Sequence, residues 1–250
     1  MDKEKQFLLH RFKDLDQQAY YRNITTFSDF LTLNERSTLQ ENLEDYYCHI
    51  SFFGGYDLSE RQIAIFQSDA PFFYENVPIS CIEIKPLSKK YAEKLTHRDV
   101  LGAFMHSGIE RDQIGDILII SDKIYVFCTE KISAYIMQEI SRIKHTSVMT
   151  RIVPMQDFDY QPEFKEVTTT ISSNRLDTFT AAACNMSRGQ TAEYIRSDQV
   201  FINGRLCNDV NHRLNDGDVI SFRGKGKVVF DGVLGNTKKE KLRIRYRWYQ

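Results

Sequence analysis

The sequence predicts an α+β protein in three successive parts, and three observations support this prediction. Its 250 residues are enough for two or three small domains that each bury a core. Segments with helical periodicity and segments with strand periodicity occur in every part of the chain. The composition, 42% hydrophobic and 27% charged, is typical of a globular protein in aqueous solution.

Composition and spacing argue against a membrane protein, a secreted protein and a metalloprotein. No apolar run approaches the roughly 18 to 20 residues that span a membrane, and the charged N-terminus lacks the apolar core of a signal peptide. The six histidines show no metal-binding spacing. We therefore expect a cytoplasmic protein without a metal or cofactor. Its five scattered cysteines are expected to be reduced thiols, at Cys48, Cys81, Cys128, Cys184 and Cys207.

The first part, residues 1–75, is predicted to be an α/β subdomain. Thr32 precedes Glu35 by three positions, which is a capping-box signature for a helix over roughly 33–44. Two strands, "YYCHISFF" and "RQIAIFQ", are expected on either side of Gly54-Gly55, with a connection longer than a two-residue hairpin. An amphipathic helix comes first in this part, with apolar positions at Phe7, Leu8, Phe12, Leu15 and Ala19.

The second part, residues 78–154, has six segments in the order strand, helix, strand, strand, helix, strand. They are "ISCIEIKP", "HRDVLGAFMHSGI", "GDILIIS", "IYVFCT", "ISAYIMQEISRI" and "SVMTRIVP". This β-α-β-β-α-β order is that of a ferredoxin-like sandwich, the architecture of RRM-like RNA-recognition modules. The Gly-aromatic signature of those modules is missing. Tyr125 and Phe127 alternate on one strand and could stack bases, but we favour packing in a core, where most aromatic side chains lie.

A linker is expected over residues 155–173, in which "EVTTTISS" could form one edge strand. The third part, residues 174–250, is basic. From Arg175 to Gln250 there are 14 Lys and Arg against 8 Asp and Glu, a formal charge of +6. The rest of the chain carries −7, with 19 basic and 26 acidic residues. This division suggests that the C-terminal end binds a polyanion.

Local signals in the third part predict two short helices followed by a hairpin. Asn185 fits the left-handed position after the helix in "RLDTFTAAAC". Ser187 is a good N-cap for the next helix, "RGQTAEYIRS", whose positive end carries Arg188 and could accept a phosphate. Asn203-Gly204 is a turn that requires positive φ after the strand "VFI", and "NDGDVISF" supplies a further turn and strand.

These residues, in this order and spacing, resemble the S4-type RNA-binding domain, also called the αL motif. The resemblance covers roughly 55 residues, with Asp198 at a position where the family usually has glycine. It rests on Arg175-Leu176-Asp177, Ser187-Arg188, Ala192, Ile195, Val200, Ile202, Asn203-Gly204 and Gly217-Asp218. It implies RNA contacts from Arg175, Ser187, Arg188, Arg196, Asn203 and Arg205, to which we add Lys225 and Lys227 as peripheral phosphate contacts in a glycine-rich loop.

Other roles remain open for some of these positions. Asp177 is expected to cap a helix or pair with an arginine, and Arg196 could simply occupy a favourable helix C-terminus. The tail "KKEKLRIRYRWY" alternates apolar and basic residues, as a strand with one buried side does. Its basic side could widen the RNA surface or protect a solvated sheet edge.

The whole chain also resembles the YlmH-like family, chiefly in "FFGGYDLSERQIAIF" (52–66) and "LTHRDVLGAFMHSGIERDQIGDILI" (95–119). This resemblance implies a non-enzymatic, cytoplasmic RNA-binding protein. Family members are linked to the large ribosomal subunit and the rescue of stalled complexes with peptidyl-tRNA, and some to cell division. We expect rRNA or tRNA as the partner of a monomeric protein that has no membrane attachment.

His97-Arg98-Asp99 raises the alternative of an enzyme. A kinase catalytic loop would need asparagine at position 104, which is Phe104, and a pseudouridine-synthase motif would need leucine before the aspartate. We favour a helix start with Thr96 as N-cap. The turn at 111–116 is interpreted as a helix-to-strand connection, with a partner-binding role as the minor alternative. An RNA-modifying enzyme and a cell-division scaffold remain the alternative functions.

Overall fold

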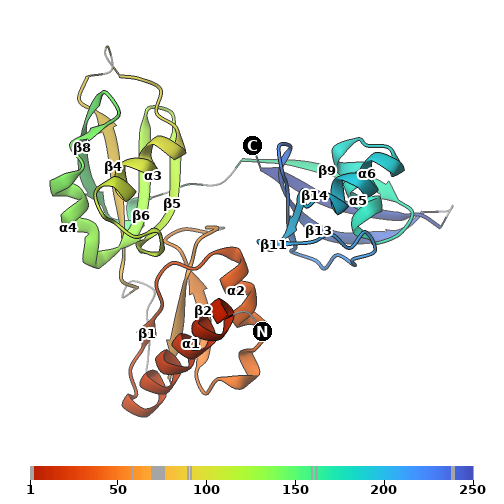
Figure 1. Ribbon diagram of the computed structural model, residues 1–250, viewed down its shortest axis with the longest axis horizontal. Coiled ribbons are helices and arrows are strands. Elements are labelled where there is room, and N and C mark those ends of the chain that lie inside the picture. The colour runs from red at the N-terminus through yellow and green to blue at the C-terminus, as the bar shows by residue number, and fades with distance from the viewer. Residues whose placement is uncertain are drawn as a thin grey trace. The chain divides into compact units, whose positions relative to one another are not determined.

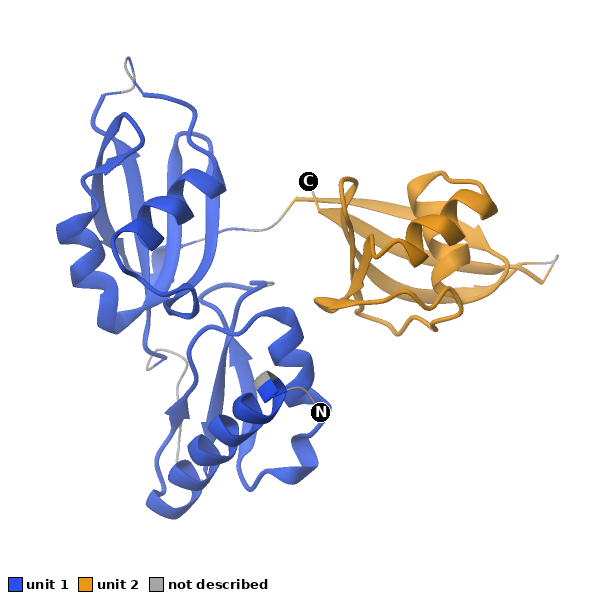
Figure 2. Ribbon diagram, viewed as in Figure 1, with its two compact units in different colours: residues 1–160 blue, residues 161–250 orange. Residues whose placement is uncertain are grey.

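In the computed structural model, the chain forms a mixed α/β protein of two compact units, residues 1–160 and 161–250 (Figure 2). The structure describes residues 3–57, 59–68, 77–88, 90, 92–158, 160, 163–237 and 240–249. Within those ranges, no helix combines the length and the apolar character needed to cross a membrane.

The first subdomain of the N-terminal unit is a three-stranded sheet with two helices (Figure 1). Its elements are α1 (Lys3–Arg22), β1 (Thr26–Phe27), α2 (Leu33–Gln40), β2 (His49–Phe53) and β3 (Ile63–Gln67), in the sheet order β1-β3-β2. The capping box of Thr32 and Glu35 is confirmed. Two details differ from the prediction. Helix α2 ends at Gln40, before a 3-10 turn. Phe7 is 72% exposed, because the side of α1 that faces the sheet is the one with Phe12 and Ala19.

The second subdomain follows the predicted element order. It contains β4 (Ile79–Pro86), α3 (His97–His106), β5 (Ile114–Ile120), β6 (Lys123–Thr129), α4 (Glu130–Glu139), β7 (Arg142–Ile143) and β8 (Thr146–Val153). The antiparallel sheet has the order β5-β6-β4-β8-β7, in which the short β7 was not predicted. Both helices pack on one face, where Val100, Phe104 and Ile136 join the strands in one core.

The two subdomains are joined by a reciprocal set of hydrogen bonds around Arg61 and Asp116. Arg61 is buried, and its guanidinium donates to the carbonyl oxygens of Ile114 (2.9 Å) and Phe30 (2.8 Å). In return, the Asp116 carboxylate accepts from the Tyr56 hydroxyl (2.7 Å) and from the backbone N–H groups of Glu60 and Arg61. The turn at 111–116 is therefore a connection inside the protein, and its aspartate binds the first subdomain.

Glycines allow the close approach at this junction. A Cβ atom at Gly115 would lie 2.5 Å from the ring of Phe30, and one at Gly55 would overlap the ring of Phe127. Gly55 also has φ of +105°, a conformation that side chains with a Cβ rarely adopt. The junction thus requires glycine for space at Gly115 and for both space and backbone conformation at Gly55.

The face of this five-stranded sheet that lies opposite α3 and α4 is covered in part by other side chains of the N-terminal unit. Phe127 is fully buried against Tyr56 and Phe158, with ring centroids 5.1 and 5.0 Å away. Tyr125 is partly buried beside Phe158 and donates a hydrogen bond to Glu83 (3.2 Å). Phe127 therefore packs in a core, as expected, and Tyr125 packs against Phe158 while it stays partly exposed.

Glu83 is a buried carboxylate in the middle of this face, with 1% of its side chain exposed. Its oxygens accept from Arg151 Nε (2.7 Å) and Nη2 (3.2 Å) and lie 2.9 Å from Lys123 Nζ. The hydrogen bonds from Arg151 and the charge of Lys123 outweigh burial and lower the pKa of Glu83 from its ordinary 4.5 to about 2.

The C-terminal unit is a six-stranded antiparallel sheet with two helices on one face (Figure 1). Its elements are β9 (Phe164–Ile171), α5 (Leu176–Cys184), α6 (Arg188–Arg196), β10 (Val200–Ile202), β11 (Arg205–Leu206), β12 (Val219–Phe222), β13 (Gly226–Asn236) and β14 (Leu242–Tyr249), in the sheet order β11-β10-β12-β13-β14-β9. The core lies between the helices and the sheet, around Phe179, Phe222 and Phe230.

One expectation for this region is confirmed and two need correction. Residues 164–171, which include most of the edge strand expected at "EVTTTISS", form the edge strand β9, because they pair along the whole of β14 and bury Ile171. β14 is consequently an internal strand, so its basic side does not protect an edge. Lys227 lies within strand β13, paired with Ser221, and only Lys225 lies in the turn before it. The other domain boundaries stay predictions.

The close packing at the junction between the subdomains can be tested by replacing a glycine there with alanine and making the same replacement at a glycine elsewhere. Gly115→Ala should lower the free energy of unfolding by about 1–3 kcal/mol, because its Cβ must displace the Phe30 ring. Gly102→Ala is the matched control: Gly102 lies inside α3 with open space around its Cβ, and alanine should stabilise the helix by about 0.5–1 kcal/mol. Urea unfolding measures both, and equal effects of the two substitutions would contradict the packing.

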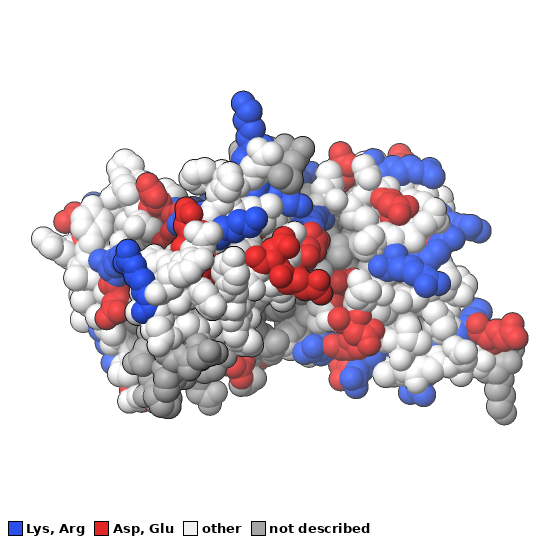
Figure 3. Space-filling view, turned by 90° about the horizontal axis from the view of Figure 1, so that it is seen from below, with Lys and Arg blue, Asp and Glu red and all other residues white. Residues whose placement is uncertain are grey.

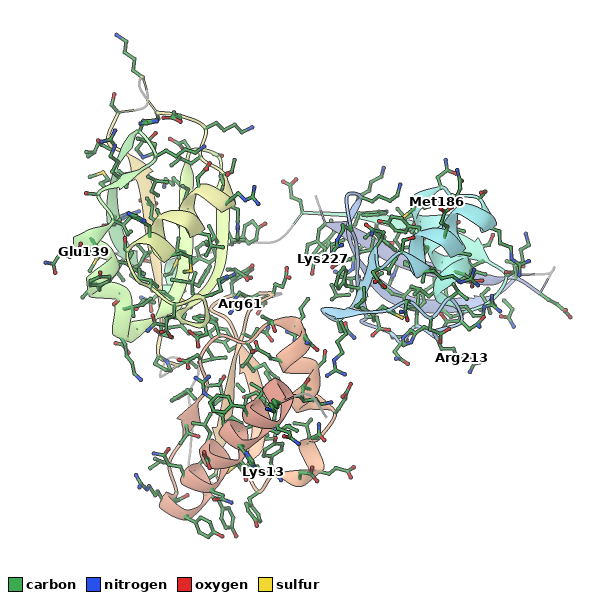
Figure 4. All side chains as sticks on the ribbon, in the orientation of Figure 1. Lys13, Arg61, Glu139, Met186, Arg213 and Lys227 are labelled. Atoms are coloured by element: carbon green, nitrogen blue, oxygen red, sulfur yellow. The ribbon has the colours of Figure 1, made fainter. Side chains whose placement is uncertain are left out.

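The Glu83 network should appear in the pH dependence of stability. Because the folded pKa is depressed, Glu83 stabilises the fold above its ordinary pKa of 4.5, and this stabilisation is lost as the pH falls toward about 2. Glu83→Gln should cost about 2–3 kcal/mol at pH 7 and reduce the loss of stability between pH 5 and 2. Glu139→Gln, an exposed site on α4, should change neither (Figure 4). If Glu83→Gln loses as much stability between pH 5 and 2 as the parent protein does, the depressed pKa of Glu83 is contradicted.

Candidate nucleic-acid interface

The turn between α5 and α6 is fixed by two local devices, both as predicted. Asn185 ends α5 with φ 52° and ψ 51°, the left-handed conformation that reverses the chain. Ser187 begins α6 in a capping box: its Oγ accepts from the N–H of Gln190 (3.4 Å), and Gln190 Oε1 accepts from the N–H of Ser187 (3.0 Å). The first residue of α6 is the exposed Arg188, which is thereby held at the positive end of the helix.

Arg175 and Arg188 line one shallow hollow at this end of the helix pair. Its other lining residues include Lys241, at the start of β14, and the hydroxyl-bearing Ser172, Ser173 and Thr178. Three cations from separate parts of the chain therefore converge on one open site. Hydroxyls and cations together are the groups that bind phosphate oxygens of RNA.

Asp177 organises this hollow. Its carboxylate accepts from the Nε of Arg175 (3.0 Å), from a second nitrogen of that guanidinium, and from the N–H of Thr178 (2.8 Å). Burial by itself would raise the pKa of Asp177, but these hydrogen bonds and the charges of Arg175 and Arg188 lower it overall. Asp177 therefore stays ionised and fixes Arg175, the structural role expected for it.

The remaining predicted residues do not lie at this hollow. Arg196 is exposed at the far end of α6, and Arg205 is half-buried on the outer strand β11. Lys225 lies 5.9 Å above the ring of Tyr194, whereas Lys227 lies 5.2 Å from the ring of Tyr249. Figure 4 shows Lys227 well apart from Met186, the residue directly before the Ser187 cap.

Asn203 is engaged inside the unit. It adopts the predicted positive φ (48°), its Nδ2 donates to Asp218 (2.8 Å), and its Oδ1 accepts from the N–H of Val219 (2.9 Å). These bonds hold the hairpin turn against the start of β12. The side chain thus has a structural role, and its contact with RNA stays a prediction.

Two further cations belong to the basic surface: Lys241, in the tail whose basic side could widen the RNA surface, and Arg223, which was not among the predicted site residues. Lys241 reaches the hollow because β14 runs beside β9, a pairing between residues about 70 positions apart. Arg223 lies 5.3 Å above the ring of Phe201, and its carbonyl accepts from the Tyr194 hydroxyl (2.6 Å). The sequence signal for Lys241 was the alternation of apolar and basic residues in the tail, and for Arg223 it was the local density of Lys and Arg. In Figure 3, the C-terminal unit shows several such basic patches, with acidic side chains between them.

The motif at His97-Arg98-Asp99 is a helix start, as the favoured interpretation held. Thr96 and Asp99 form a capping box, and Lys144 lies 2.9 Å from the Asp99 carboxylate. Hydrogen bonds from Lys144 and Thr96 lower the pKa of Asp99 to about 2. Within the described ranges, no group of three or more His, Cys, Asp or Glu is placed to hold a metal ion.

Comparison with known proteins gives a consistent assignment. The family described as "Putative RNA-binding domain in YlmH" matches residues 74–157. The chain is 26% identical over 239 residues to the ribosome-associated protein quality control protein P2 of Bacillus subtilis (strain 168), covering 94% of this chain and 90% of that protein. The solved structure of the cell division protein ylmH from Streptococcus pneumoniae shares the fold, with a TM-score of 0.52 and 19% identity over 63% of this chain and 95% of that one. The chain is thus similar to proteins of the YlmH family in sequence and in fold, in line with the resemblance seen in its sequence.

Proposed function

We propose that this protein is a non-enzymatic RNA-binding factor that binds structured rRNA or tRNA through its C-terminal unit. The observation that carries the proposal is the convergence of Arg175, Arg188 and Lys241 on one open hollow. A capped helix start adds the partial positive charge of its backbone N–H groups at the same place. Such a site binds phosphates without reading bases, which suits recognition of RNA by its shape.

The two architectures expected from the sequence fit this proposal. The order β5-β6-β4-β8 with two helices on one face is consistent with a ferredoxin-like, RRM-like domain. The α5–α6 turn followed by the β10–β11 hairpin is consistent with the S4-type domain that the sequence resembles. We assign RNA binding primarily to the second, because the sheet face that RRM domains use is filled in the first by Phe158 and the Glu83 network.

The cellular setting follows from the relatives. The B. subtilis protein is named for ribosome-associated protein quality control. By analogy, this chain would act on the large ribosomal subunit, in the rescue of complexes that carry stalled peptidyl-tRNA. It would act in the cytoplasm and as a monomer, with rRNA or tRNA as its ligand.

A binding role without catalysis is supported by the contacts of Asp99, the residue considered above as a catalytic candidate. Asp99 is held by Thr96 and Lys144 and serves as a helix cap, so its carboxylate is engaged within the fold. Asp99 lines a surface pocket beside Arg98 and His106, but its carboxylate is already bound to the helix cap and to Lys144. Mass spectrometry of RNA from a deletion strain tests this: loss of a modified nucleotide, restored by the protein, would contradict the proposal.

The hollow can be tested by removing two of its cations. Arg188→Ala with Lys241→Ala should weaken binding of a folded RNA hairpin by at least about tenfold, or about 1.4 kcal/mol. The slope of log K against log[salt] should become shallower by about 2, because two phosphate contacts are lost. Fluorescence anisotropy at several salt concentrations measures both quantities.

The control removes a charge elsewhere. Lys13→Ala deletes an exposed cation on α1 (Figure 4), and it should leave the affinity and the salt slope unchanged. If the double variant at the hollow binds the hairpin as tightly as the parent protein, the assignment of the surface is wrong.

A further inference from the structure

The sheet of the C-terminal unit has a second face, on the side away from α5 and α6. Along β14, Ile244 and Tyr246 are buried under the helices, so the alternate residues lie on this second face. Those residues are Arg243, Arg245 and Arg247. Because β14 is hydrogen-bonded to β13 on one side and β9 on the other, the three arginines form a row inside the sheet.

The residues around this arginine row carry fewer negative charges than the row carries positive ones. Its cross-strand neighbours on β9 are Thr170, Thr168 and Glu166, opposite Arg243, Arg245 and Arg247. Asp231 lies 2.8 Å from Arg247 and 3.7 Å from Arg245, so one carboxylate is shared by two guanidinium groups. The Arg245 side chain remains 45% exposed, and Arg243 is exposed. Two carboxylates, Glu166 and Asp231, thus lie beside three arginines, and the row keeps a net positive charge.

Two aromatic rings adjoin the end of the row. Phe164 on β9 and Tyr249 on β14 are cross-strand partners with ring centroids 4.8 Å apart. Arg247 lies 4.7 Å above the Phe164 ring, and Lys227 lies 5.2 Å from the Tyr249 ring. Aromatic rings beside cations are the combination that binds single-stranded nucleic acid, since rings stack on bases while cations contact the backbone.

We propose that this face, defined by Arg243, Arg245, Arg247, Lys227, Phe164 and Tyr249, binds a single-stranded segment of RNA. Alternate residues of a strand are about 6.7 Å apart, close to the spacing of consecutive phosphates in an extended nucleic-acid strand. The arginine row can therefore follow the backbone of one strand. An unpaired base can stack at the Phe164–Tyr249 pair, whereas the bases of a duplex are already stacked on each other.

This second surface extends the proposed function. The hollow at α6 binds folded RNA, and the sheet face on the other side of the unit binds an unpaired strand. A protein with both surfaces could hold a folded RNA together with a neighbouring single-stranded segment.

The test uses the full chain and a fluorescently labelled 12-nucleotide oligouridylate, followed by anisotropy. Arg243→Gln with Arg245→Gln should weaken binding at least tenfold, and the salt slope should become shallower by about 1.4, since each contact with a single strand contributes about 0.7. Tyr249→Ala should weaken binding with little change in the salt slope. Arg247 is left intact because it holds Asp231.

Two controls separate this face from the hollow and from general charge. Arg188→Ala, which removes the hollow cation on α6, and Lys13→Ala should both bind oligouridylate like the parent protein. The sheet-face variants should in turn bind the folded hairpin normally. Circular dichroism melting should show that every variant is folded, and Arg243→Gln alone serves if the double variant is not.

Several outcomes would overturn the inference. They are absence of oligouridylate binding by the parent protein, unchanged binding by the sheet-face variants, and an equal loss in Arg188→Ala or in Lys13→Ala. The first would leave the face to another kind of partner, such as a protein. The two proposals can also fail separately. If the sheet-face variants lose oligouridylate binding while substitution of Arg188 and Lys241 leaves hairpin binding unchanged, this inference is supported and the proposed hollow is refuted.

Discussion

The buried guanidinium of Arg61 is the interaction on which the N-terminal unit depends. It satisfies backbone carbonyls of the second subdomain and of the loop before α2, while Asp116 receives donors from the segment around Arg61. Buried polar groups are stable only when they are paired, so each half of this arrangement requires the other. Gly55 and Gly115 bring the two subdomains close enough for these bonds to form. The stretches 52–66 and 95–119, which carry the resemblance to the YlmH family, are therefore the segments that meet at this junction.

This junction has a consequence for function. It uses part of the sheet face that an RNA-recognition module would leave open, since Phe127 packs against Tyr56 of the first subdomain. The remainder of the face carries Glu83, whose negative charge is compensated by Arg151 and Lys123. Neither feature favours base stacking. The basic charge of the chain is instead concentrated after residue 174, which is where the hollow and the arginine row lie.

The C-terminal unit presents its cations on elements that are rigid for local reasons. A capping box and the left-handed turn at Asn185 fix the backbone of Arg188 at the start of α6, and Asp177 holds the guanidinium of Arg175. On the sheet, Asp231 holds Arg245 and Arg247. A positioned cation loses less side-chain entropy when it binds a phosphate than a mobile one does. The acidic residues among these cations thus serve to orient them.

The sequence by itself determined most of the local structure of this protein. The caps at Thr32, Thr96 and Ser187, the turn residues Asn185 and Asn203, and the β-α-β-β-α-β order were all predictable. Each depends on residues a few positions apart, and such interactions leave a pattern in the sequence. The resemblance to the S4-type domain predicted that Arg175 and Arg188 belong to one RNA-binding surface, since both lie in the short segment that carries the motif.

Only the tertiary structure decided the contacts between distant segments. It packed Phe127 and Tyr125 against Phe158, joined Arg61 to Asp116, and chose β14 as the partner of the edge strand at residues 164–171. That pairing moved β14 inside the sheet and brought Lys241 to the hollow. These outcomes depend on which surfaces are buried against each other, and burial is a property of the assembled fold, so periodicity along one segment does not reveal it.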